Sequence, residues 1–393
     1  MNMTKLHTGQ FDIFVAGDDA ATDCDYLYGG TRAMPAGTSD EDVLTEISRL
    51  QRDESALKNA LINVALRKGA LDGLNPVRFP AGFFGSRVGG ARCILRPVDE
   101  SAAQVIADPS RADFEAAITP VFAETGRHLN RLGGRIKLTP DFGRFAGLAD
   151  LLYRHTPHVL GIQCEKGGCG GKASYSTTGV MAAFETLGCN SAPGNVTLIG
   201  SAGAMGSGFL RYLMDAETAA LAICDLAYDH RAEPEAPPAG VTVLASEDKR
   251  FTDACLTRGG TLVMMTLGRE LENSDWQAIL PGTVMLLAHN LAMPRGSEGR
   301  WLARALQRQG VKAYPGQVLT LGGALTSRLE WFWRKNNAGR PFDKPLAHEV
   351  VRAVVSFLVK RIEADCISHG LTPLEAMYHI AEGDARTRVT KSA

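Results

Sequence analysis

The segment Val196–Gly206 constrains the fold of this chain more than any other. It reads Val-Thr-Leu-Ile-Gly-Ser-Ala-Gly-Ala-Met-Gly, a β-rich apolar run that leads into a glycine turn. An amphipathic helix follows, and after it a second apolar run, Ala219–Cys224, ends in Asp225. Strand, glycine turn, helix, strand and acid in this order build a dinucleotide-binding βαβ unit.

Each glycine of this loop has a predicted role. Gly200 allows the tight turn, Gly203 lets backbone N–H groups approach a pyrophosphate, and Gly206 lets the helix pack closely on the strand. Asp225 would accept hydrogen bonds from a ribose 2′-hydroxyl, which favours NAD over NADP. The spacing is irregular, because Ser201 occupies the position of the usual first glycine. The predicted cofactor-binding residues of this unit are Gly200, Ser201, Ala202, Gly203, Ala204, Met205, Gly206 and Asp225.

The composition is that of an ordinary globular protein. The 393 residues are 45% hydrophobic and carry a formal net charge of −1, so nothing favours a nucleic acid or a membrane as partner. The N-terminus lacks the apolar region of a signal peptide, and most of the eight cysteines lie in apolar segments. We therefore expect a cytoplasmic protein. Cys164 and Cys169 do not have the spacing of a zinc site, so the loop around them is predicted to be flexible and metal-free.

The hydrophobic pattern predicts an α/β fold. Helical periodicity covers residues 40–73 and 111–131, and Ala91–Leu95 is typical of a buried strand. Further strands are expected at 158–162, 241–245, 261–265, 283–288 and 317–321. This alternation predicts a Rossmann-type, doubly wound parallel sheet behind an N-terminal α/β substrate domain.

The C-terminal tail is predicted to be helical. It has an apolar stripe from Leu346 to Ile362, and Thr372-Pro373-Leu374-Glu375 has the pattern of a capping box. We expect these helices to return to the first domain. The predicted domains are a substrate-binding and oligomerisation domain at 1–156, an NAD-binding domain at 157–345 and the C-terminal helices at 346–393.

Five short motifs lie in order along the chain. They are Tyr28-Gly29-Gly30-Thr31-Arg32, Thr139-Pro140-Asp141-Phe142-Gly143, Tyr175-Ser176-Thr177-Thr178-Gly179-Val180, Leu287-Ala288-His289-Asn290 and Leu321-Gly322-Gly323. In this order they resemble motifs of the glutamate/leucine/phenylalanine/valine dehydrogenase family, most closely its leucine dehydrogenase branch. The resemblance implies an NAD-dependent, homo-oligomeric enzyme that oxidises the α-amine of an amino acid or runs the reverse reaction through an imino acid. It also adds five predicted cofactor-binding residues, namely Ser176, Thr178, Thr266, Ala288 and Asn290.

The family's chemistry needs a cation for the substrate carboxylate, an amine that activates water and a carboxylate that moves protons. Asp141 matches the proton-moving aspartate. Lys58, in Lys58-Asn59-Ala60, matches the carboxylate-binding lysine, with Lys68 as a rival. The catalytic candidates are thus Asp141, Lys68 and Arg92, and the substrate-binding candidates are Gly30 and Lys58.

Arg92 is the main departure from the family pattern. The best match to the family's Gly-Gly-Gly-Lys is Gly89-Gly90-Ala91-Arg92, with arginine in place of the water-activating lysine. A guanidinium stays charged in practice, so it can clamp a carboxylate but cannot easily act as a base. Two alternatives therefore stay open beside amino acid oxidation. One is a divergent imine or 2-oxo acid reductase, and the other is an NAD-binding regulatory protein without catalysis.

Overall fold

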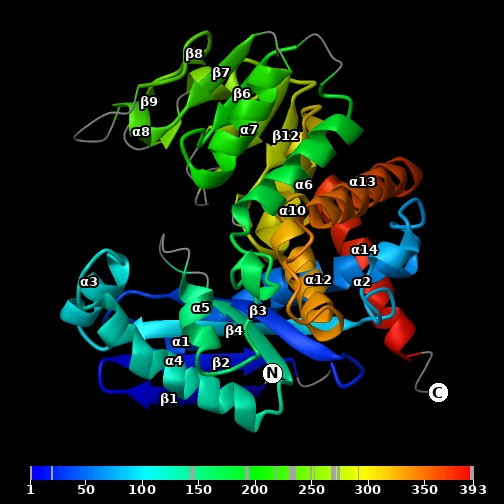
Figure 1. Cartoon of the computed structure of the whole chain (residues 1–393). Helices are drawn as coiled ribbons and strands as arrows, with labels where there is room; N and C mark the ends of the chain where they lie inside the picture. The colour runs from blue at the N-terminus through cyan, green and yellow to red at the C-terminus, as the bar shows by residue number, and fades with distance from the viewer. Residues whose placement is uncertain are drawn as a thin grey trace. The chain divides into compact units, whose positions relative to one another are not determined.

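The structure is a computed structural model (Figure 1). It describes residues 2–18, 21–140, 142, 147–190, 194–216, 218, 220–229, 236–247, 250–251, 253–266, 271, 275–290 and 292–389. The chain forms two compact units. Unit 1 comprises residues 1–67, 72–172 and 324–346, and unit 2 comprises residues 68–71, 173–323 and 347–393.

Unit 1 is built on a five-stranded mixed sheet with the strand order β1-β2-β4-β3-β5. β3 pairs in parallel with both β4 and β5, whereas β2 pairs antiparallel with β1 and β4. Its elements are β1 (Asn2–Thr8), β2 (Phe11–Gly17), β3 (Tyr26–Ala33), α1 (Asp40–Leu50), α2 (Leu57–Arg67), β4 (Val88–Pro97), α3 (Glu100–Ala107), α4 (Phe114–Arg131), β5 (Ile136–Pro140), α5 (Leu148–Tyr153) and most of α12 (Gly322–Asn336).

The two faces of this sheet have different roles. Leu27, Ala91 and Leu138 point to one face, where they join the apolar core formed with α3, α4 and α5. Successive side chains of a strand point to opposite faces. Tyr28 and Thr139 therefore lie on the other face, which carries the polar residues described below.

A π-helical turn at Gln51–Ala56 separates α1 from α2 and packs closely on this second face. A Cβ atom on Gly29 would collide with the carbonyl of Ala91 and lie 3.1 Å from Ser55 Oγ. A Cβ on Gly90 would come within 2.5 Å of the backbone nitrogen of Ala56. Gly90 thus lets the turn approach the sheet, and Gly29 leaves room for the Ala91 carbonyl of β4. π-Turns of this kind are frequent at functional sites.

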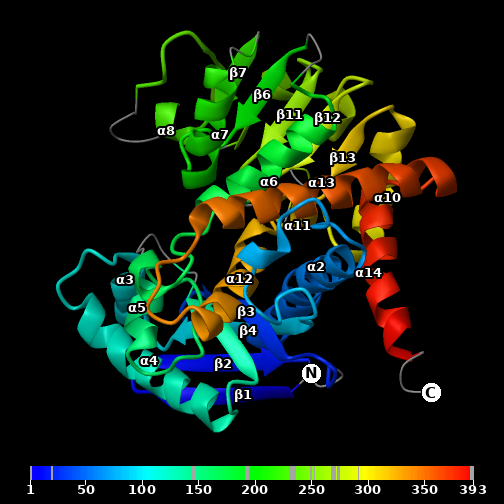
Figure 2. The same ribbon diagram turned by 45° about the vertical axis from the view of Figure 1, so that its right-hand side comes forward.

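Unit 2 has a six-stranded, all-parallel sheet with the order β13-β12-β11-β6-β7-β8 (Figure 2). The strands β6 and β7 are buried along their whole length, as expected for a parallel sheet covered on both faces. Its main elements are α6 (Ala173–Thr186), β6 (Val196–Ile199), α7 (Ala204–Asp215), β7 (Leu221–Cys224), α8 (Leu226–Asp229), β8 (Thr242–Val243), α9 (Asp253–Leu256), β11 (Thr261–Met264), β12 (Val284–Leu287), α10 (Gly296–Arg308), β13 (Lys312–Tyr314), α11 (Gly316–Leu319), α13 (Lys344–His369) and α14 (Pro373–Val389). A small antiparallel pair joins β9 (Ser246–Glu247) to β10 (Arg250–Phe251). The predicted α/β fold with a Rossmann-type sheet is confirmed.

The compact units differ from the expected domains at the C-terminus. Residues 324–346 group with unit 1, and residues 347–393 group with unit 2. The reason lies in α13, whose apolar stripe packs on α6: a Cβ on Gly179 would lie 3.4 Å from a methyl group of Val355. The predicted capping box at the start of α14 is confirmed by reciprocal hydrogen bonds between Thr372 and Glu375.

Two expected strands are not formed. The segment predicted as a strand at 317–321 forms the end of α11 and the turn after it, because Pro315 and Gly316 begin a helical turn that packs on the His289 carbonyl. The strand expected at 158–162 is reduced to one bridge between Val159 and Leu138.

None of the described helices combines the length and the hydrophobicity that crossing a bilayer requires.

Candidate functional site

The glycine loop of unit 2 has the geometry of a close backbone turn. Gly200 has φ 81°, a left-handed conformation that favours glycine. A Cβ on Gly206 would collide with the carbonyl oxygen of Gly200, so the third glycine permits the close helix–strand contact. α7 begins at Ala204, and its cap residue Gly203 makes no side-chain capping bond. The first-turn N–H groups of α7 have no acceptor within the helix, and a helix N-terminus of this kind favours an anion.

Asp225 lies beside this loop, directly after β7. One of its carboxylate oxygens accepts a hydrogen bond from the backbone N–H of Ala202 at 2.8 Å, and the other accepts one from Ala227 at 2.9 Å. The hydroxyl of the fully buried Ser201 is 3.0 Å from the Tyr228 hydroxyl. The structure therefore brings the predicted acid and the glycine loop together at the carboxyl ends of β6 and β7, where doubly wound folds bind ligands.

Three further predicted cofactor residues lie at the carboxyl ends of neighbouring strands. Thr266 follows β11, and its Cγ2 is 3.4 Å from the position of a Cβ on Gly200. Its buried hydroxyl has no hydrogen-bond partner among the described residues. Ala288 and Asn290 follow β12, and the side-chain oxygen of Asn290 is 3.4 Å from the Thr320 hydroxyl.

Two further predicted cofactor-binding residues, Thr178 and Ser176, lie on α6. The hydroxyl of Thr178 lies 2.7 Å from His348 Nδ1 on α13, so it already has a partner within unit 2. Ser176 lies close to the backbone of Gly322. The residue that contacts the glycine loop is Thr177, which donates a hydrogen bond to the Met205 carbonyl at 3.2 Å.

The described substrate-side candidates are divided between the two units. Gly30 (on β3), Lys58 (near the start of α2) and Arg92 (on β4) belong to unit 1. Arg92 is 3.6 Å from a carboxylate oxygen of the buried Glu54, so part of its charge is already compensated. Lys68 is exposed beyond the end of α2 and belongs to unit 2, and Asp141 lies outside the described residues.

A polar cluster that the sequence analysis missed lies on the second face of the unit 1 sheet. The ammonium of Lys172 donates hydrogen bonds to the Tyr28 hydroxyl and, at 2.6 Å, to Thr139 Oγ1. The Tyr28 hydroxyl donates to Ser327 Oγ at 2.8 Å, and Thr139 Oγ1 donates to the Leu160 carbonyl at 2.9 Å. Lys172 follows Gly-Gly-Cys-Gly-Gly, a sequence that predicts a flexible loop. The missed signal was a lysine placed between that glycine run and a helix start.

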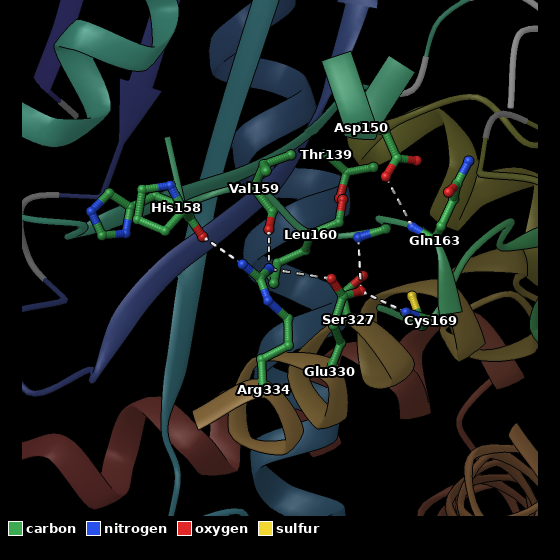
Figure 3. A network of polar contacts seen from close by, with 12 residues as sticks. Thr139, Asp150, His158, Val159, Leu160, Gln163, Cys169, Ser327, Glu330 and Arg334 are labelled. Atoms are coloured by element: carbon green, nitrogen blue, oxygen red, sulfur yellow. Dashed lines mark hydrogen bonds and ion pairs between the residues drawn. The ribbon is translucent and has the colours of Figure 1, made fainter. Parts of the chain in front are cut away.

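Glu330 and Arg334 of α12 hold the loop that precedes Lys172 (Figure 3). Glu330 is fully buried and accepts hydrogen bonds from the backbone N–H groups of Gly161 at 2.7 Å and Cys169 at 3.0 Å. Arg334 lies 3.5 Å from Glu330 and donates to the Val159 carbonyl at 2.7 Å. A charged pair thus fixes both ends of the segment in place, which corrects the expectation of a flexible loop.

Lys137 is a buried lysine on the same face. It is 3% exposed, its ammonium lies 3.6 Å from the centre of the Trp331 ring, and it donates to the Gly134 carbonyl at 2.7 Å. Burial, reinforced by the charges of Lys335 and Arg334, lowers the pKa of Lys137 from 10.5 to about 7. Burial and the Lys137 charge likewise lower the pKa of the neighbouring His158.

The lowered pKa of Lys137 predicts a pH-dependent stability. Between pH 7 and pH 10 the unfolded chain holds the Lys137 proton more tightly than the folded chain does, so stability rises with pH. Relative to Lys137→Met, the free energy of unfolding of the wild type should rise by about 3 kcal/mol over this range. Urea unfolding at several pH values measures this, with Lys360→Met at an exposed position as control. If the free energy of unfolding changes with pH in the same way in the wild type and in Lys137→Met, the prediction is wrong.

One group of possible metal ligands occurs among the described residues, although the sequence predicted none. Asp365 and His369 of α13 and His379 of α14 place their ligand atoms within 4.8 Å of one another. The Asp365 carboxylate already accepts hydrogen bonds from His379 Nδ1 at 2.9 Å and pairs with Arg361 at 3.2 Å. Asp365 is therefore already paired, and its hydrogen bond with His379 links α13 to α14.

Comparison with known proteins gives a match in structure only. No protein-family model and no curated protein sequence matches the chain. Among solved structures it resembles L-tryptophan dehydrogenase from Nostoc punctiforme, at 17% identity and a TM-score of 0.65 over 98% of this chain and 96% of that one. It also resembles the leucine-bound hetero-hexameric glutamate dehydrogenase from Thermus thermophilus, at 15% identity and a TM-score of 0.63 over 99% and 89% of the two chains.

A third match is the glutamate dehydrogenase from Peptoniphilus asaccharolyticus, at 16% identity and a TM-score of 0.56 over 96% of this chain and 87% of that one. The three solved proteins are amino acid dehydrogenases, and each matches this chain over almost its whole length. Identities this low establish architecture rather than activity. The chain therefore has the two-domain fold of the amino acid dehydrogenases.

Proposed function

We propose that this protein is an NAD-dependent oxidoreductase that transfers hydride at the α-carbon of an amino or imino acid. The glycine loop of unit 2 carries the proposal, because its turn, the N-terminus of α7 and Asp225 lie together as a dinucleotide requires. Unit 2 would hold NAD through this loop, and unit 1 would hold the amino or imino acid. The motif resemblance favours the leucine dehydrogenase branch and a homo-oligomer.

The chain's own residues have distinct tasks in this proposal. The bound nucleotide supplies the hydride acceptor or donor. The N–H groups at the start of α7 would bind its phosphates, and Asp225 would bind the ribose hydroxyls. Lys58 and Gly30 would contact the substrate, and Asp141 would move protons.

Turnover assays test the proposal directly. The purified protein is incubated with NAD and a panel of amino acids, and with NADH, ammonia and a panel of 2-oxo acids. We expect a change in NADH absorbance with at least one member of each panel. Nucleotide binding with no turnover of any amino, imino or 2-oxo acid would overturn the proposal and favour a regulatory NAD-binding protein.

The pairing of Arg92 with Glu54 favours a second candidate function. A guanidinium that replaces the family's lysine and lies 3.6 Å from a buried carboxylate is poorly suited to activate water. Reduction of an imine or a 2-oxo acid needs no such base. Turnover of 2-oxo acids or cyclic imines without ammonia, together with inactivity toward amino acids, would identify this reductase.

Asp225→Ser should change the choice of nucleotide. Loss of the carboxylate removes an acceptor for the ribose hydroxyls and a negative charge that repels a 2′-phosphate. We expect the affinity for NADH to fall about tenfold, equivalent to about 1.4 kcal/mol, and that for NADPH to rise. Fluorescence titration with both nucleotides measures this, with Asp215→Ser at the exposed end of α7 as control. An unchanged NADH/NADPH ratio would contradict the assignment of Asp225.

A further inference from the structure

We propose that Asp365, His369 and His379 bind a zinc ion that links α13 to α14. Asp365 and His369 lie near the end of α13, and His379 lies on α14. Each residue offers one ligand atom, and the three atoms lie within 4.8 Å of one another. All three residues belong to unit 2, and the inference does not depend on the proposed function.

The positions on the two helices bring the ligands together. Asp365 and His369 are four positions apart, which places their side chains on one face of α13. His379 approaches from α14: its Nδ1 lies 2.9 Å from a carboxylate oxygen of Asp365, and its ring centre lies 5.5 Å from that of His369. A tetrahedral zinc ion with bonds of about 2.1 Å needs ligand atoms roughly 3.4 Å apart. The exposed side chain of His369 can close the remaining distance by rotation.

The Asp365 carboxylate is oriented so that one of its oxygens faces the histidines. Asp365 is only 3% exposed. Its Oδ1 pairs with Arg361 Nε at 3.2 Å, whereas its Oδ2 faces His379. The pair with Arg361 can therefore persist while Oδ2 binds the metal, and ligating carboxylates usually keep such a second partner. The free energy of zinc coordination exceeds that of the hydrogen bond between Asp365 and His379 that the ion would replace.

Contacts that do not involve the three ligands hold the two helices near the site. Glu363 of α13 accepts a hydrogen bond from Lys312 of β13 at 2.8 Å. Gln307 of α10 donates a hydrogen bond at 3.2 Å to the carbonyl of Leu371, which lies between α13 and α14. The ligands are thus held close to their binding positions before the ion arrives. Such preorganisation lowers the entropic cost of binding.

The types of ligand favour zinc over magnesium or calcium. Two imidazoles and one carboxylate are typical ligands of transition metals, whereas Mg²⁺ and Ca²⁺ take oxygen ligands. With three protein ligands, the fourth position of a tetrahedral ion is left for water. The bound ion would hold the end of α13 against α14. The stability of this pair of helices would therefore depend on zinc.

Calorimetric titration of the full-length protein, first treated with EDTA, tests the site. We expect one zinc ion per chain to bind with a Kd of about 10 µM or lower, and magnesium not to bind. His369→Asn removes an exposed ligand and should weaken zinc binding about tenfold or more. The control is His7→Asn, because His7 forms a similar pair with Asp12 at 2.8 Å, but the described residues place no third ligand beside that pair. A higher Kd, or a smaller loss in His369→Asn, would overturn the inference.

Hydrogen exchange measured by mass spectrometry locates the ion without a substitution. Zinc should slow amide exchange about threefold or more in peptides that cover residues 363–380, because the ion suppresses local opening of the two helix ends. Peptides that cover β1 and β2, which carry the pair of His7 and Asp12, should exchange at the same rate with and without zinc. Unchanged exchange at 363–380 in the presence of saturating zinc would overturn the inference. Neither measurement requires turnover, so failure of the proposed function would leave this result standing.

Discussion

Glu330→Ala is expected to lower the free energy of unfolding by about 3–5 kcal/mol, because it leaves two buried backbone N–H groups without their acceptor and removes the charge that faces Arg334. Glu330 is fully buried, and one of its carboxylate oxygens accepts from two backbone N–H groups, those of Gly161 and Cys169. The other oxygen lies 3.5 Å from Arg334. The substitution therefore removes the acceptor of two buried donors together with the charge that Arg334 faces.

Urea unfolding followed by tryptophan fluorescence measures this loss. Glu330→Gln keeps the shape and one oxygen, so its loss should be smaller, about 1.5–3 kcal/mol. The matched control is Glu115→Ala, because Glu115 forms an exposed ion pair with Arg154. Such exposed pairs contribute only about 0–1 kcal/mol. If Glu330→Ala unfolds at the same urea concentration as Glu115→Ala, Glu330 does not hold the loop.

Gly206→Ala is the second substitution with a large expected effect. The helical backbone at this position accommodates alanine, but the added Cβ would collide with the carbonyl oxygen of Gly200. Either the glycine loop or α7 must move. We expect a stability loss of about 1–3 kcal/mol from overpacking. The affinity for NADH should fall at least tenfold, equivalent to about 1.4 kcal/mol, because the loop no longer presents its N–H groups to the phosphates.

Gly208→Ala in the same helix is the control for this prediction. The nearest atom to its Cβ would be a methyl group of Thr177 at 3.4 Å, an ordinary contact distance. Alanine in place of glycine within a helix is stabilising by about 0.5–1 kcal/mol. Thermal unfolding and NADH titration of both variants show whether the two substitutions differ in their effects on stability and on NADH affinity. Equal NADH affinity in Gly206→Ala and the wild type would show that this loop does not bind the nucleotide.

Much of unit 2 could be predicted from the sequence because its signals are local. The apolar run of β6, the glycine turn and the periodicity of α7 lie within twenty residues of one another. The capping box of α14 involves residues only three positions apart. Each of these features depends on backbone dihedrals and neighbouring side chains, which the sequence specifies directly. The strand wrongly expected at 317–321 has only a short apolar run, which does not distinguish a strand from a helical turn.

The polar cluster of unit 1 has no such local signal. Tyr28 is separated from Thr139 by 111 positions, from Lys172 by 144 and from Ser327 by 299. The sequence suggested Lys58, Lys68 and Arg92 as the basic residues, because they lie in or near recognisable motifs. It did not suggest Lys172, because glycine-rich sequence usually indicates flexibility unless distant residues restrain it.

The sequence by itself therefore determined the fold class, the glycine loop and the acid beside it, since these follow from periodicity and turn chemistry. Only the tertiary structure decided which cation lies among the hydroxyls of the unit 1 sheet. Strand order places β3 beside β5, and the buried Glu330 of α12 fixes the loop that carries Lys172. Contacts of this kind depend on how distant segments pair and pack, which no local pattern encodes.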